Sequence, residues 1–101
     1  MLYKVQARFN QSKAKEFYQK LTNGTIEKQE PDGPEIVASM HRATMDSSGL
    51  INWTEQCFCS SPLNHERATV YDQYFSDLKT EQIENHEKFE GDSFIKHLSK
   101  F

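Results

Sequence analysis

Near its N-terminus the chain carries the stretch Tyr3-Lys4-Val5-Gln6-Ala7-Arg8-Phe9, in which apolar and polar residues alternate without a break. This period of two predicts a β-strand with one buried face, because successive side chains of a strand point to opposite sides of the sheet. The apolar residues would then face the core. The polar residues, Lys4, Gln6 and Arg8, would face the other side of the sheet.

A helix is predicted directly after this strand. Four apolar residues recur at the spacing i, i+3, i+4 and i+7, which forms one stripe along a helix: Ala14, Phe17, Tyr18 and Leu21. Gly24 can end this helix in the left-handed conformation. A polar connection follows, and it closes with the turn residues of the range 31–34.

Two further strands are expected on either side of a short turn. Residues 35–45 are expected to form the second strand and residues 50–59 the third, joined by the turn residues 46–49. In the third strand, Cys57 and Cys59 would share a face with Trp53.

The rest of the chain predicts a second helix, a fourth strand and a short terminal helix. Ser61 would cap the second helix and Pro62 would take its first position, where a missing N–H costs nothing. The fourth strand would cover residues 77–83, and the terminal helix would start at Asp92.

This order of elements predicts an α+β domain of the ferredoxin-like type. Such a domain has an antiparallel sheet with both main helices on one face, and its first and third strands lie side by side in the middle. The length of 101 residues allows a single domain spanning residues 1–101. Leu, Ile, Val and Phe together make up about a fifth of the residues, which indicates a thin core.

Charge and hydropathy exclude several classes of function. The net charge is −3, and no run of Lys or Arg offers the basic patch that nucleic-acid binding needs. No apolar stretch is long enough for a membrane helix, and the N-terminus lacks the apolar core of a signal peptide. We therefore expect a cytoplasmic protein with reduced cysteines, and neither nucleic acid nor a membrane as a partner.

The sheet face that the helices leave uncovered is the first candidate site. Ligand-binding residues there would be Arg8, Gln6, Thr54 and Gln56. The guanidinium of Arg8 could clamp a carboxylate or a phosphate. His41, in the expected second strand, could exchange a proton near neutral pH and act as a catalytic residue. The simpler interpretation is a solvated sheet face without a site.

Glu55 is the one carboxylate on an otherwise apolar strand face. If it is buried, its pKa is raised and it becomes a candidate catalytic base. The alternatives are a position near the solvated end of the strand and a salt bridge to a helix Lys or Arg.

Cys57 and Cys59 offer a second kind of chemistry. Strand geometry separates their Cα atoms by roughly 6.6–6.8 Å, at the limit for a disulfide. They are expected to be buried thiols that act as small apolar side chains. Alternatively, Cys59 could be a reactive thiol just before a helix N-terminus, with His65 or Arg67 lowering its pKa.

A metal site is the remaining alternative for the two cysteines. It would combine Cys57, Cys59 and His65 with a fourth ligand from His41 or Glu66. Because the chain has no second cysteine pair, the sequence by itself favours no metal and no cofactor.

Two functions follow as expectations. The first is a small ligand-binding domain or cofactor-independent enzyme that works as a homodimer through its open sheet face. The second is a non-catalytic interaction module that docks a partner through an edge strand or through its aromatic-rich C-terminal end. The apolar residues of that end are Phe89, Phe94, Ile95, Leu98 and Phe101.

Overall fold

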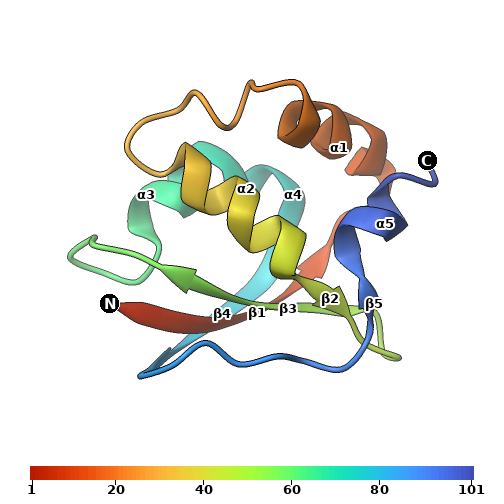
Figure 1. Cartoon of the computed structure of the whole chain (residues 1–101). Coiled ribbons are helices and arrows are strands. Elements are labelled where there is room, and N and C mark those ends of the chain that lie inside the picture. Colours follow the sequence, from red (N-terminus) through yellow and green to blue (C-terminus); the bar gives the residue numbers. More distant parts are fainter.

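The computed structural model describes residues 1–101 and combines a five-stranded antiparallel sheet with helices on one of its faces (Figure 1). The strand order is β4-β1-β3-β2-β5, and every neighbouring pair runs antiparallel. The strands are β1 (Leu2–Phe9), β2 (Thr44–Met45), β3 (Leu50–Gln56), β4 (Phe75–Ile83) and β5 (Asp92–Ser93). The expected mixed α+β class with an antiparallel sheet is confirmed.

β1 is an interior strand, paired along both of its edges, and its alternating sequence suits that position. Tyr3, Val5, Ala7 and Phe9 are all buried. Val5 stands opposite Trp53 of β3 on one side and opposite Thr80 of β4 on the other. The two strands that were expected to be neighbours, β1 and β3, are therefore paired.

The expectation of a strand over residues 35–45 is wrong. These residues form α2 (Gly33–Arg42), and only Thr44 and Met45 pair as a strand. Gly33, Ile36 and Met40 are buried, at the spacing i, i+3, i+7 of a helix face. Pro34 lies in the first turn of the helix, where proline is favoured. Helical periodicity therefore outweighs the alternation that the same residues also permit.

The other helices follow the expected positions with shifted ends. α1 (Ala14–Thr22) and the terminal α5 (Phe94–Leu98) are present. The second expected helix is continuous from Asn64 to Tyr74, as α3 (Asn64–Glu66), a π-helical turn (Arg67–Tyr71) and α4 (Asp72–Tyr74).

The expected cap at Ser61 and the extension of β3 to Cys59 are both wrong. β3 ends at Gln56, and residues 57–63 form a loop. Leu63 is fully buried and has a left-handed backbone with φ of 55°, so the helix cannot begin until the residue after it.

Aromatic rings fill the space between the sheet and the helices. The ring of Phe94 lies 5.0 Å from that of Phe9 and 6.0 Å from that of Phe75. Phe94 and Leu98 are fully buried, whereas Phe101 is exposed. The C-terminal end therefore packs its main apolar residues against its own domain.

Phe94→Ala is expected to lower the free energy of unfolding by about 3–5 kcal/mol, because it leaves a cavity among these rings. Phe101→Ala at the exposed C-terminus should change it by less than about 0.5 kcal/mol. Urea denaturation of both variants measures the difference. Equal effects would show that α5 does not complete the core.

A crossing segment (residues 84–91) covers part of the sheet face opposite the helices (Figure 1). The Nδ1 atom of His86 lies 2.5 Å from the Thr54 hydroxyl, and the Lys4 ammonium lies over the Phe89 ring. Thr54 is consequently buried. The expectation that this outer face is uncovered is therefore only half right.

No helix has both the length and the apolar character that spanning a bilayer requires.

Candidate functional site

The structure does not gather the residues expected on the sheet face into one pocket. His41 lies exposed on α2, on the helix side of the sheet. Arg8 is exposed on the outer face and pairs with Asp77 at 3.4 Å. The Gln6 amide donates to Asn52 at 3.0 Å, and Thr54 lies under the crossing segment. His41 and Arg8 therefore cannot act on one ligand within a single chain.

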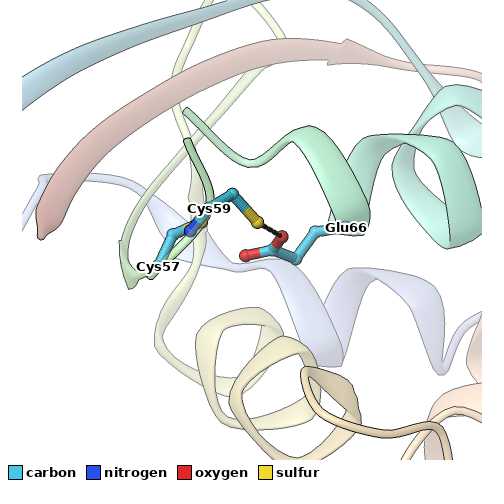
Figure 2. Close-up of side chains that lie close together, drawn as sticks. All are labelled: Cys57, Cys59 and Glu66. Carbon is cyan, nitrogen blue, oxygen red and sulfur yellow. Dashed lines mark hydrogen bonds between the residues drawn. The ribbon is translucent and has the colours of Figure 1, made fainter. Parts of the chain in front are cut away.

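A different group forms where the 57–63 loop meets the start of α3. The Cys59 thiol donates to Oε1 of Glu66 at 3.3 Å, and the Cys59 amide donates to Sγ of Cys57 at 3.3 Å. Figure 2 shows the Cys59 sulfur pointing at the Glu66 carboxylate, with Cys57 alongside. The two sulfurs and a carboxylate oxygen all lie within 4.8 Å of one another. Both cysteines are free thiols.

The negative charge of the Glu66 carboxylate is buried without a Lys or Arg to neutralise it. Glu66 is only 1% exposed, no Lys or Arg pairs with it, and a thiol is the one side chain that hydrogen-bonds it. A thiol is a weak donor. Buried carboxylates are normally paired with a cation or coordinate a metal. The group combines ligand types that divalent metal ions use with a buried carboxylate that no Lys or Arg neutralises.

The Cys57 thiol is not a ready nucleophile. Burial raises its pKa to about 12, so it stays protonated at neutral pH in the absence of a cation. A metal ion reverses this situation, because a coordinating thiol is deprotonated outright. Cys57 is therefore not a free thiolate, and it could bind a metal ion only by releasing its proton.

Asp32 and His65 form a second group that shares Glu66 with the first. Nδ1 of His65 contacts Oδ2 of Asp32, and ligand atoms of these two residues and Glu66 lie within 4.8 Å of one another. This second group contains no sulfur, and the first contains no imidazole.

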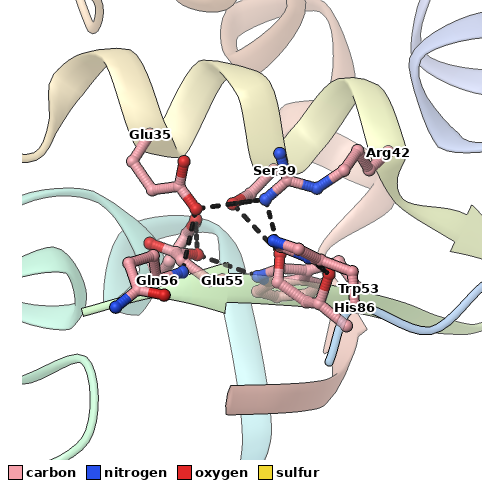
Figure 3. Close-up of polar contacts among 9 residues, drawn as sticks. Glu35, Ser39, Arg42, Trp53, Glu55, Gln56 and His86 are labelled. Carbon is pink, nitrogen blue, oxygen red and sulfur yellow. Dashed lines mark hydrogen bonds and ion pairs between the residues drawn. The ribbon is translucent and has the colours of Figure 1, made fainter. Parts of the chain in front are cut away.

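A hydrogen-bond network joins the first turn of α2, which follows Asp32, to the end of β3. Oε2 of Glu35 accepts a hydrogen bond from the backbone N–H of Gln56 at 2.8 Å and one from the Arg42 guanidinium at 3.1 Å (Figure 3). Gly33 allows the start of α2 to pack closely, since a Cβ there would lie 2.2 Å from the carbonyl oxygen of Ile26. The Glu35–Gln56 hydrogen bond ties the first turn of α2 to the end of β3, where the 57–63 loop begins.

A sheet-end hollow of about 390 Å³ opens between the start of α2 and the 57–63 loop. Its lining residues are Pro31, Asp32, Glu35, Gln56, Phe58, Cys59 and His65. Residues from both groups, Cys59 of the first and His65 and Asp32 of the second, therefore face a space that a small molecule can enter.

Glu55 is fully buried next to this site but does not line the hollow. Its Oε1 accepts hydrogen bonds from Trp53 Nε1 at 2.9 Å and from the Tyr71 hydroxyl at 2.5 Å, while Oε2 has no partner (Figure 3). Burial raises the pKa of Glu55 to about 8. Of the alternatives that the sequence left open, the buried carboxyl with a raised pKa is the one observed.

Comparison with protein-family models, with curated proteins and with solved structures found no match for this chain. Of the site residues, the sequence analysis grouped Cys57, Cys59 and His65 with either His41 or Glu66 as a fourth ligand, and it missed Asp32. The sequence signal for the residues that it did group is that two thiols, an imidazole and a carboxylate lie within ten residues, at positions 57 to 66.

Proposed function

We propose that this domain binds a divalent transition-metal ion of the zinc class through Cys57, Cys59 and Glu66. The observation that carries the proposal is the Glu66 carboxylate, which is buried beside two free thiols and is not paired with any Lys or Arg. Zinc takes sulfur, nitrogen and oxygen ligands in a tetrahedral arrangement. A bound ion would neutralise Glu66 and stabilise both thiolates.

Three protein ligands leave one tetrahedral position for a ligand from solution. Sites that keep a position open are typical of metal ions that act on a substrate, whereas structural zinc sites are closed by four protein ligands. The sheet-end hollow supplies access, because Cys59 lines it. We therefore propose that the small-molecule binding expected from the sequence takes place at the open position of this metal ion. A reducing compartment, as expected for a cytoplasmic protein, would keep the thiols available.

Titration of the reduced, metal-free protein with Co²⁺ tests this proposal. We expect near-ultraviolet bands from thiolate bound to Co²⁺, together with displacement of the Co²⁺ by Zn²⁺. Cys57→Ser combined with Cys59→Ser removes both thiols and should abolish these bands. The matched control is Ser60→Ala combined with Ser61→Ala, which changes two exposed residues of the same loop and should leave them intact. Absence of thiolate bands in the wild-type protein would refute the proposal.

The fold is proposed to be a ferredoxin-like core of β1 to β4 to which β5 and α5 are added. Support comes from the antiparallel order β4-β1-β3-β2. Further support comes from the positions of α1 and α2 between β1 and β2, and of α3 and α4 between β3 and β4. This element order is the split βαβ arrangement.

A second candidate function is ligand binding on the outer face, as the sequence suggested. One observation favours it. The Thr44 hydroxyl is buried without a hydrogen-bond partner, in a hollow of about 390 Å³ that Thr54 and Phe89 also line. A screen of small organic acids by NMR tests it: amide shifts confined to these residues support the candidate, and their absence removes it.

The expected homodimer stays a prediction, and sedimentation velocity would measure it.

A further inference from the structure

We propose that the site holds two metal ions bridged by the Glu66 carboxylate. One ion would lie in a sulfur pocket (Cys57, Cys59 and Glu66), and the other in an imidazole pocket (Asp32, His65 and Glu66). The inference rests on the proposed function and extends it from one ion to two. Its basis is that Glu66 belongs to both groups of ligand atoms and is the one residue that they share.

Distances favour two ions over one ion with five ligands. Ligand atoms that bind one tetrahedral ion at about 2.0–2.3 Å lie roughly 3.3–3.8 Å apart. Within each group the ligand atoms already lie within 4.8 Å of one another, so small side-chain movements suffice to close each pocket on an ion. The five residues do not form one such group. A single ion could therefore collect them all only through larger movements.

Charge favours the same conclusion. When both cysteines are ionised, the two thiolates and the two carboxylates of Glu66 and Asp32 carry four negative charges. Two divalent cations neutralise them, whereas one would leave two negative charges in a half-buried site with a neutral His65. Glu35 adds no unbalanced charge, because Arg42 pairs with it at 3.1 Å. Desolvated charge without compensation is costly, so the neutral dinuclear state is the favoured one.

The imidazole pocket can open to accept its ion. A divalent ion would replace the proton between Nδ1 of His65 and the Asp32 carboxylate, the proton would pass to solvent or to the other ring nitrogen, and the two groups would move apart to bind the ion. The His65 side chain is 43% exposed and so is free to make this movement.

The two pockets should differ in metal preference. Thiolates select softer ions such as Zn²⁺, whereas imidazole with carboxylates also suits Mn²⁺. Both pockets border the sheet-end hollow, through Cys59 on one side and through Asp32 and His65 on the other. Paired ions about 3.5–4 Å apart clamp the attacking and leaving oxygens of hydrolytic reactions. The substrate class that fits is a phosphate ester or another oxyanion able to bridge both ions.

Metal stoichiometry tests the inference. The reduced, metal-free full chain is titrated with Zn²⁺ by calorimetry and with Co²⁺ by absorption, and bound metal is counted by elemental analysis after gel filtration. We expect two equivalents per chain, with the thiolate bands complete after the first. Asp32→Asn and His65→Ala should each lose the second equivalent and keep the thiolate bands.

Two further variants test whether the Glu66 carboxylate binds both ions and whether the loss in His65→Ala is specific to that histidine. Glu66→Gln should weaken both equivalents at least about tenfold, because both pockets use its carboxylate. His97→Ala is the matched control for His65→Ala; His97 lies on α5 and hydrogen-bonds Gln11, and its variant should still bind two equivalents. Circular dichroism of each metal-free variant reports whether it is folded.

The outcomes distinguish this inference from the proposed function. One equivalent per wild-type chain with thiolate bands overturns the dinuclear site and leaves the mononuclear proposal standing. This holds even if His65→Ala weakens that equivalent, since His65 would then be the fourth ligand of a single ion. Absence of any thiolate band overturns both. The wild-type stoichiometry decides the question even if a variant fails to fold.

Discussion

Zinc at a thousandfold excess over its dissociation constant is expected to raise the free energy of unfolding by about 4 kcal/mol. The reason is linkage: the ion binds the folded chain, in which the 57–63 loop and α3 bring Cys57, Cys59 and Glu66 together. For a domain of this size the midpoint of thermal unfolding should rise by more than about 10 °C.

Thermal denaturation with zinc and with a chelator measures this effect. Cys57→Ser combined with Cys59→Ser should show the same midpoint under both conditions. The exposed Glu84→Gln variant should respond to zinc as the wild type does. An unchanged wild-type midpoint would mean that the folded state does not bind the ion.

In the metal-free protein, Glu55→Gln is expected to remove a large pH dependence of stability. The pKa of Glu55 is about 8 in the folded state against an ordinary value of 4.5. Between these values the folded state holds a proton that the unfolded state has lost, so stability falls as pH rises from about 4.5 to about 8. The loss is as much as about 4 kcal/mol over that window.

Glutamine reproduces the shape of the protonated carboxyl and can accept the same hydrogen bonds from Trp53 and Tyr71. Relative to wild type, Glu55→Gln should therefore become more stable as pH increases. Urea denaturation with a chelator, at intervals from pH 5 to pH 8, measures both proteins. Parallel stability curves would contradict a carboxyl that is protonated in the folded state.

The first strand, β1, could be predicted because one periodicity dominates it. In residues 3–9 alternation is unbroken, and no helical spacing competes with it. Residues 35–45 allow both periods, since Ile36 and Met40 fit an alternating strand as well as a helix face. The choice depends on Pro34 and on packing against β3, and the second of these is a tertiary contact.

The same limit explains which site residues were missed. Cys57, Cys59, His65 and Glu66 are close in sequence, so their grouping could be considered from spacing alone. Asp32 joins them only because Glu35 and Gln56 hold the start of α2 beside the 57–63 loop. The crossing segment was unpredictable for a related reason: a polar run carries no periodic signal for the face on which it lies.

X-ray absorption at the zinc edge of the zinc-loaded protein tests the central claim most directly. Binding by Cys57 and Cys59 predicts a sulfur shell at about 2.3 Å beside oxygen or nitrogen ligands at about 2.0 Å. A spectrum with oxygen and nitrogen ligands alone would show that the two thiols do not bind the metal, and would contradict the account.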